Sequence, residues 1–311
     1  MSGVMLSLFL FCLRRACELE RSDTVFGSYV RIKVLGENRK MLAQGIDSVL
    51  TALHRFDSLW SVFTEKSEVS QLNKYGKFAV SQVTRELIER AKGFGIETGG
   101  VFDITVGPLM RLWGFKSGVF RVPDSGEIRR VLKGVGFERV RVLGDSVFLD
   151  KNMEIDLGGI AVGFAVDRAV EILQNFGAKA GLIDAGGDIR VFGERDWRLG
   201  VQSPRGESLS LVLILRNGAV STSGDYRRFF EVQGKRYTHI IDPRSGYPAD
   251  RCVAVTVKAP SCIEADVYAT ALFVMGPDEG RRWLAGHKVI GAIFYYLSGD
   301  SVKEVRAGFD E

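Results

Sequence analysis

The pattern of apolar and polar residues over 154–188 predicts a strand, a tight turn, a helix and a second strand. The apolar run 155–157 favours a strand and is broken by two glycines, after which apolar side chains recur at helical spacing over 160–176. Gly177 then ends the helix, and 180–183 predicts the second strand. Such a unit favours a right-handed parallel crossover, with Asp156 and Asp184 near the ends of neighbouring strands.

The same periodicity predicts the elements on either side. Residues 25–34 alternate like a half-buried strand, so we expect the folded domain to begin near Thr24. Helices are predicted over 39–56, 84–98, 125–135 and 264–276, strands over 197–203 and 209–215, and hairpins over 140–149 and 228–241. Ser67 and Ser125 are expected to cap helices. Many glycine turns between short elements indicate an α/β fold rather than a repeat or a coiled coil.

The composition of the chain argues against several classes of function. The formal net charge is only +4, and the basic pairs are scattered without interleaved aromatic residues, which argues against nucleic-acid binding but suits a polyanionic small molecule. The four cysteines have no Cys-x-x-Cys spacing and no nearby histidines, so zinc and thiol–disulfide centres are disfavoured. They are Cys12, Cys17, Cys252 and Cys262.

An apolar run over 4–13 opens the chain. It is too short for a membrane-spanning helix, but it could be the core of a signal peptide, with Cys17 as a lipid-anchored cysteine. We therefore expect 1–23 to be a signal-like or anchor segment, 24–311 to be one domain, and the protein to be extracytoplasmic. The alternative is a start site assigned in the wrong place, with a cytoplasmic protein.

His239 is a candidate general base. It stands near the end of the predicted strand 236–241, and Asp242 follows as a carboxylate that could orient it. A side chain with a near-neutral pKa suits proton transfer in this position. A purely structural histidine is the alternative.

Several further residues could bind an anion or a metal. The glycine turn before the helix 160–176, and the small hydroxyl residues over 221–226, suit phosphate oxygens. Asp266 and Thr270 are four residues apart on one predicted helix face, and their oxygen atoms suit Mg²⁺; helix capping and a backbone bond are the alternative. Asp103 and Thr105 either reach into a cleft or cap the turn that follows them.

Seven motifs in order closely resemble the ApbE family, the FAD:protein FMN transferases, over roughly residues 24–300. They are Ser61-x-Phe63 with Ser67-Glu68 and Leu72-Asn73; Gly100-x-Phe102-Asp103-x-Thr105-x-Gly107-Pro108-Leu109; Asp156-Leu-Gly-Gly-Ile-Ala161; Ala185-Gly-Gly-Asp188; Thr222-Ser-Gly-Asp-Tyr226; His239-Ile-Ile-Asp-Pro-Arg-Ser-Gly246; and Ala265-Asp266 with Ala269-Thr270.

The resemblance implies an α/β fold related to the T-fold, with mixed sheets and packed helices. It implies an enzyme that splits FAD and transfers FMN to a Thr or Ser hydroxyl of an acceptor protein, with release of AMP. Mg²⁺ would be held by the Gly159 carbonyl, Asp266 and Thr270, and His239 would be the base. The FAD contacts carried over from the family are Phe26, Phe63, Val101, Phe102, Asp103, Asp156, Val162 and Ile240.

This chain departs from the family pattern at several of these positions. The family usually has Lys at 162 and Tyr at 164, where this chain has Val162 and Phe164. Loss of the lysine removes a positive charge near the flavin nucleotide, whereas the metal set and His239 are intact. An Mg-dependent FAD pyrophosphatase and a non-catalytic flavin-binding protein stay open as alternatives. The implied acceptor carries an Asp-x-x-Ser/Thr-Gly-Ala-Thr-like segment in a membrane redox complex or an extracytoplasmic flavoprotein.

Overall fold

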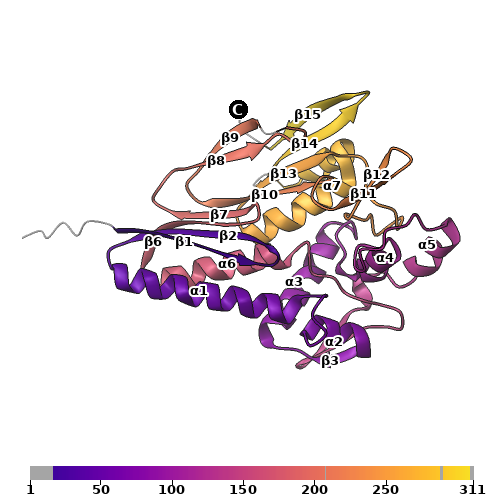
Figure 1. Cartoon of the computed structure of the whole chain (residues 1–311), viewed down its shortest axis with the longest axis horizontal. Coiled ribbons are helices and arrows are strands. Elements are labelled where there is room, and N and C mark those ends of the chain that lie inside the picture. The colour runs from indigo at the N-terminus through magenta and orange to yellow at the C-terminus, as the bar shows by residue number, and fades with distance from the viewer. Residues whose placement is uncertain (1–16, 207, 288–289, 309–311) are drawn as a thin grey trace, which may run out of the picture.

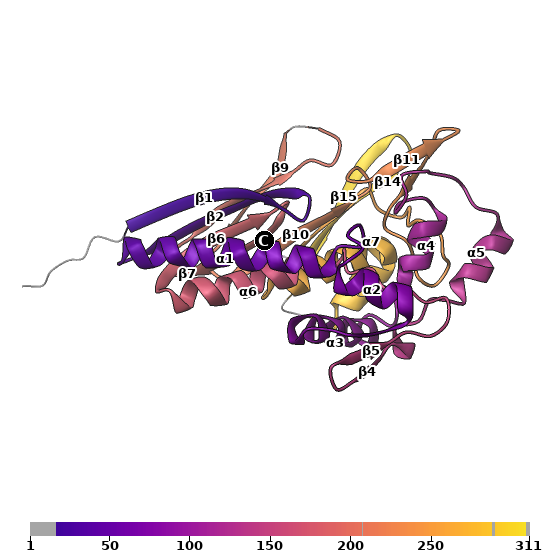
Figure 2. The same ribbon diagram turned by 60° about the horizontal axis from the view of Figure 1, so that its bottom comes forward.

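A twisted sheet of eight strands is the central element of the fold (Figures 1 and 2). The computed structural model describes residues 17–206, 208–287 and 290–308. Within these ranges every pair of neighbouring strands in the sheet is antiparallel. In spatial order the strands are β1 (Cys17–Val25), β2 (Ser28–Gly36), β6 (Ala178–Ala185), β7 (Asp188–Gly193), β10 (Gly218–Gly224), β13 (Ala254–Ala259), β14 (Gly291–Ser298) and β15 (Ser301–Ala307).

Three long helices cover one face of this sheet (Figure 1). They are α1 (Arg39–Trp60), α6 (Ala161–Asn175) and α7 (Cys262–Leu284), with α6 packed between the other two. Side chains alternate across a strand, so Ile183 of β6 joins the core under the helices while its neighbour Leu182 faces the other way. Leu182 packs there against the hairpin of β8 (Trp197–Gln202) and β9 (Leu209–Leu215).

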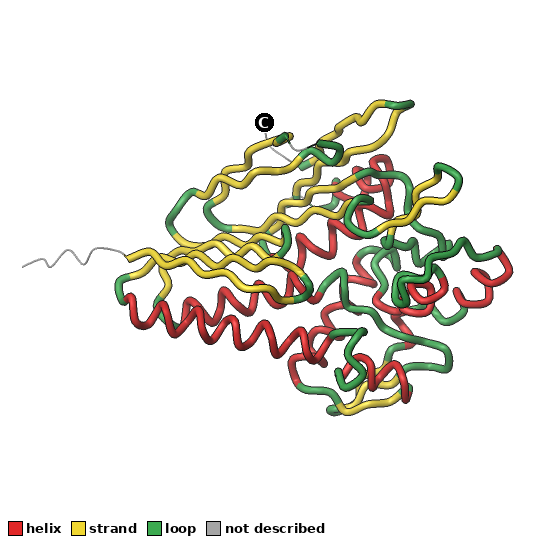
Figure 3. Tube along the Cα trace, in the orientation of Figure 1, coloured by secondary structure: helices red, strands yellow, loops and turns green. Residues whose placement is uncertain are grey.

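The smaller elements gather beyond one end of the helical layer, which we call the loop-rich end because long loops connect them (Figure 3). A three-stranded sheet and a second hairpin lie among short helices. These elements are α2 (Glu68–Tyr75), β3 (Lys77–Ala79), α3 (Gln82–Glu97), η1 (Ile104–Val106), α4 (Gly107–Leu112), α5 (Ser125–Leu132), η2 (Phe137–Arg139), β4 (Arg141–Leu143), β5 (Ser146–Phe148), β11 (Phe229–Val232) and β12 (Lys235–Thr238).

The predicted α/β class is confirmed, and the predicted helices and hairpins form close to their expected positions. Ser67 caps α2, its hydroxyl accepting a hydrogen bond from the Ser70 N–H at 3.0 Å. The predicted cap at Ser125 is wrong. Asp124 caps α5 instead, because its carboxylate accepts the Glu127 N–H while the Glu127 side chain reaches back to the Asp124 N–H.

The predicted parallel crossover is also wrong. Residues 155–157 are not a strand, and β6 runs antiparallel to both of its neighbours. The Asn73 side chain accepts the Ile155 N–H at 2.7 Å and donates to the Ile155 carbonyl at 2.8 Å. The Asn73 side chain therefore bonds the backbone groups that a neighbouring strand was expected to bond. Asp156 lies in a loop rather than at the end of a strand next to Asp184.

The N-terminal part of the sheet begins earlier than Thr24. Residues 25–34 contain a turn at Phe26-Gly27, and β1 places 17–23 in the sheet as its edge strand. Residues 1–16, which include most of the predicted signal-like segment and Cys12, lie outside the described residues. In the described ranges, no helix has both the length and the apolar character needed to cross a membrane, and Cys17, Cys252 and Cys262 are unpaired thiols.

A close contact between the first turns of α6 and α7 fixes how these two helices meet. A Cβ at Gly163 would lie 2.6 Å from the Cys262 carbonyl oxygen, so only glycine permits this approach. The Asp167 carboxylate then accepts the N–H groups of Cys262 and Ile263, each at 2.9 Å. A side chain of α6 thus caps α7 together with the Ser261 capping box.

We predict that Asp167→Ala lowers the free energy of unfolding by about 1–3 kcal/mol, because two buried N–H groups lose their acceptor. Urea unfolding followed by circular dichroism measures this change. Asp47→Ala is the control, since Asp47 is an exposed residue of α1. Equal stability of the two variants would show that the α6–α7 cap is dispensable.

Candidate active site

A single cavity of about 610 Å³ lies where the N-terminal turn of the sheet, the three long helices and the loop-rich end meet. Its walls come from the β1–β2 turn, the end of α1, the start of α6, the β6–β7 turn, β10 and α7. All twelve residues predicted to act in catalysis or binding line it. They are Phe26, Phe63, Val101, Phe102, Asp103, Asp156, Gly159, Val162, His239, Ile240, Asp266 and Thr270.

His239 follows β12 and is oriented by a backbone carbonyl. Its Nδ1 lies 3.1 Å from the Arg228 carbonyl oxygen, which can only accept, so the proton is on Nδ1 and Nε2 has a free lone pair. The prediction that the Asp242 carboxylate orients His239 is wrong. That carboxylate instead pairs with Arg244, whose Nε lies 3.0 Å from its Oδ1. Burial, together with the charge of Arg228, lowers the pKa of His239 to about 4. The imidazole is therefore neutral at pH 7 and able to accept a proton.

Two carboxylates, those of Asp188 and Asp266, line the same cavity. Asp266 is 7% exposed and accepts the Gly163 N–H at 3.1 Å, while Asp188 accepts a hydrogen bond from the Ser221 hydroxyl. Burial and the nearby Asp188 charge raise the pKa of Asp266 well above its usual range, and burial raises the pKa of Asp188 to about 6. A cation bound between two such carboxylates would offset the repulsion between their charges.

The remaining oxygen donors complete a candidate metal centre. The Thr270 hydroxyl lies 3.3 Å from that of Ser223, and a Cβ at Gly159 would lie 3.4 Å from the Thr270 oxygen. The Gly159 backbone is thus beside Thr270, one helical turn from Asp266. Among the described residues, no group of three or more His, Cys, Asp or Glu side chains could hold a metal ion, so the site depends on hydroxyl and backbone oxygens. An all-oxygen set fits Mg²⁺ better than a softer metal.

Aromatic side chains form the other end of the cavity. Phe26 has φ +56°, in the left-handed region that a bulky residue rarely adopts, and its ring stacks on Trp60 with centroids 6.5 Å apart. Phe63 is 67% exposed and lies under the Arg228 guanidinium at 6.0 Å. Strained and exposed rings that face a cavity suit a planar ligand that stacks on them.

Asp103 lines the cavity but also has a structural role. One carboxylate oxygen accepts from the Thr105 N–H at 2.7 Å and from its hydroxyl, and the other accepts from the Phe137 N–H at 3.0 Å. Burial raises the pKa of this carboxyl. The hydrogen bonds of Asp103 and Thr105 are therefore those of the predicted cap of the following turn.

Several cavity residues were not singled out from the sequence. Asp188, Arg227 and Lys116 all line the cavity, and the Arg227 guanidinium lies so close to Gly187 that a Cβ there would be 2.8 Å from its Nη2. The basic pair at 227–228 was grouped with scattered surface charges, although it directly follows the Thr222–Tyr226 motif. Residues 221–224, whose hydroxyls were expected to suit phosphate oxygens, form the end of β10 and line the cavity.

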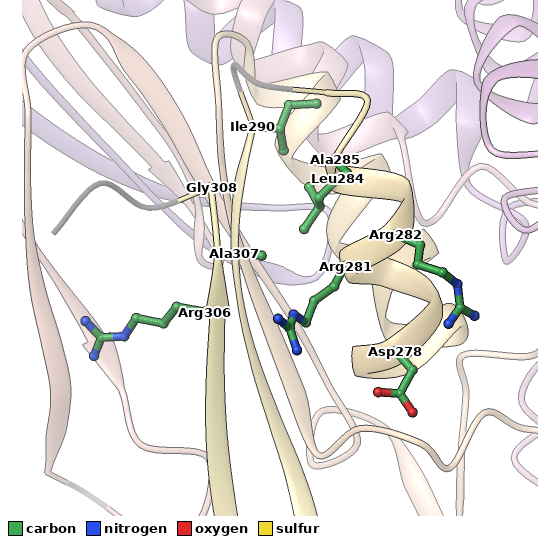
Figure 4. Close-up of a pocket in the computed structure, with 9 residues that line it drawn as sticks. All are labelled: Asp278, Arg281, Arg282, Leu284, Ala285, Ile290, Arg306, Ala307 and Gly308. Carbon is green, nitrogen blue, oxygen red and sulfur yellow. The ribbon is translucent and has the colours of Figure 1, made fainter.

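A second depression, of about 840 Å³, lies between α7 and β15 and is more open to solvent (Figure 4). Three arginines line it, yet Arg306 is paired with Glu304, and Figure 4 shows Arg282 and Arg306 extending away from one another. None of the predicted site residues lies there. The cavity with its base, acids and hydroxyls is therefore the candidate active site.

Comparisons with known proteins point to one family. The model of the ApbE family matches residues 26–294. A protein from Vibrio cholerae named FAD:protein FMN transferase is 35% identical, covering 96% of this chain and 93% of that protein. The crystal structure of the ApbE protein from Thermotoga maritima aligns with a TM-score of 0.86 at 34% identity, covering 94% of this chain and 97% of that one. The Pseudomonas stutzeri flavinyl transferase ApbE, in its apo form, aligns with a TM-score of 0.84 at 28% identity, covering 94% and 95%.

We predict that the His239 imidazole stays neutral down to about pH 5, because its pKa is about 4. Proton NMR of the three histidines between pH 4 and 8 tests this, with His239→Ala identifying the resonance. A midpoint near the ordinary histidine value of about 6.5 would contradict the burial and the tautomer described above.

Proposed function

The chain belongs to the ApbE family, and on that basis we propose that it is an FAD:protein FMN transferase that uses Mg²⁺ and modifies a Thr or Ser hydroxyl. The observation that carries the proposal is the convergence of a neutral histidine and an all-oxygen ligand set on one cavity. A protein that only stored flavin would need neither. The aromatic end of the cavity suits the isoalloxazine or adenine ring of FAD, which is the substrate.

The chain's own residues account for the transfer of the proton. His239 Nε2 takes the proton of the acceptor hydroxyl as its oxygen bonds to the phosphorus of the FMN half of FAD. The bond from that phosphorus to the oxygen shared with AMP breaks, and AMP leaves with the electron pair. Asp266, Thr270 and the Gly159 carbonyl would hold Mg²⁺, which, when bound, supplies positive charge that offsets the charge of the diphosphate.

The family's lysine at position 162 is replaced by Val162, but other cations surround the cavity. Arg227 and Arg228 both line it and are exposed, and neither guanidinium forms an ion pair within the part of the chain that the structure describes. Their charges are available to the FAD diphosphate. We therefore propose that the loss of the lysine is compatible with FAD binding.

The acceptor, in this proposal, carries an Asp-x-x-Ser/Thr-Gly-Ala-Thr-like segment in a membrane redox complex or an extracytoplasmic flavoprotein. The apolar run over 4–13 supports an exported enzyme, anchored through a lipid or held near the membrane. We therefore propose that the protein acts on the outer face of the membrane.

We predict that His239→Ala retains FAD affinity but slows FMN transfer by about 10²–10⁴-fold, because the hydroxyl loses its proton acceptor. Flavin fluorescence measures binding, and in-gel flavin fluorescence of the acceptor measures transfer. His54→Ala is the matched control, since His54 lies on the surface and contacts Asp23. Transfer at the wild-type rate by His239→Ala would exclude this residue as the base.

We predict that Asp266→Asn abolishes Mg²⁺ binding while it retains the fold. The amide oxygen can still accept the Gly163 N–H, but the charge that attracts the cation is gone. Isothermal titration of Mg²⁺ in the presence of FAD measures the affinity, and circular dichroism checks the fold. Asp278→Asn, on the same helix but away from the cavity, is the control. If both variants bind Mg²⁺ equally well, the metal is held elsewhere.

A further inference from the structure

Three apolar side chains are exposed in the loop that joins α4 to α5. Val119 is 74% exposed, Phe120 46% and Val122 44%, and we call these three residues the apolar rim. None of them is among the residues that line the cavity. Both ribbon views place α4 and α5 at the loop-rich end of the molecule (Figures 1 and 2).

The loop that carries the apolar rim is held in a defined shape. Gly114 has φ +87°, and a Cβ there would lie 2.1 Å from the Val119 carbonyl oxygen, so the loop packs directly on this glycine. The Phe120 ring stacks on buried Phe230 with centroids 5.0 Å apart. Arg121 forms a double hydrogen bond to Glu127 at 2.8 and 2.9 Å. The apolar rim is therefore exposed although its backbone is fixed, which is the organisation of a preformed binding surface.

The apolar rim is linked to the catalytic histidine by one intervening ring. Phe115 lines the cavity, and its centroid lies 6.4 Å from the His239 ring and 5.6 Å from the Phe120 ring. The Arg228 side chain donates to the Phe115 carbonyl at 2.6 Å, and the Arg228 carbonyl in turn orients His239. A molecule that presents a hydroxyl to His239 from outside therefore passes close to the apolar rim.

We propose that the apolar rim is the docking surface for the acceptor protein, which presents apolar side chains beside the hydroxyl that receives FMN. This inference rests on the proposed function, because that reaction requires a second protein to reach His239. Burial of the exposed apolar side chains favours the complex and holds the hydroxyl at the mouth of the cavity. Residues of the apolar rim thus select the acceptor without contacting FAD.

Two synthetic peptides test this proposal directly. Both carry the same Asp-x-x-Thr-Gly-Ala-Thr segment, flanked in one peptide by Leu and Val and in the other by Ser. The wild-type protein is expected to modify the apolar-flanked peptide with a kcat/KM about tenfold higher. Val119→Ser and Phe120→Ser should each remove this preference and leave the Kd for FAD unchanged.

Matched control variants show whether the loss of preference is specific to the apolar rim or follows the loss of any exposed apolar side chain. Ile214→Ser and Leu143→Ser remove apolar side chains that are 63% and 62% exposed but lie on β9 and β4. Both should keep the wild-type preference. Phe120 also packs on Phe230, so Val119→Ser, which removes no ring contact, keeps the test valid if Phe120→Ser unfolds.

Several results would overturn the proposal. One is equal modification of the two peptides by the wild-type protein, and another is an unchanged preference in Val119→Ser. If Val119→Ser instead converts a dimer to a monomer in sedimentation, with the preference intact, the apolar rim serves self-association. FMN transfer to neither peptide, with FAD still bound, would remove the proposed function and this inference with it.

Discussion

The close contact between the first turns of α6 and α7 is the constraint on which the candidate active site depends. Gly163 lets the helices approach until its N–H reaches the Asp266 carboxylate at 3.1 Å. Asp167, one turn further along α6, caps the start of α7. Because both anchors act on the same two helices, Asp266 and Thr270 are held against the Gly159 turn before any ligand binds. The position of the candidate metal ligands is thus a consequence of helix packing rather than of a flexible loop.

The chemistry follows from how charge is distributed around the cavity. Burial and the charge of Asp188 raise the pKa of Asp266, and Arg227 and Arg228 also line the cavity. A divalent cation neutralises the acids, and a diphosphate matches both the cation and the arginines. His239 stays neutral between these charges because its ring is half-buried and because a backbone carbonyl accepts its Nδ1 proton. The cavity is therefore prepared for phosphoryl transfer rather than for binding alone.

Local patterns in the sequence predicted most helices and hairpins, and the family motifs predicted which residues would share a cavity. What could not be predicted depends on distant partners. Residues 155–157 were predicted to be a strand, but Asn73, 82 positions away, satisfies the backbone N–H and carbonyl of Ile155. Asp242 follows His239 in sequence, yet Arg244 engages it and the Arg228 carbonyl takes its expected role. Residues 221–224 are rich in small polar side chains, yet they form a strand because they pair with β13. Tertiary hydrogen bonds decided each case.

We propose that this chain transfers FMN from FAD to a hydroxyl of another protein. Mass spectrometry of a peptide with an Asp-x-x-Thr-Gly-Ala-Thr segment, after incubation with the protein, FAD and Mg²⁺, tests it most directly. We expect the peptide to gain FMN on its threonine, with one AMP released for each peptide modified. Release of AMP and free FMN with the peptide unmodified would contradict the transfer and identify a hydrolase. Intact FAD would contradict the chemistry altogether.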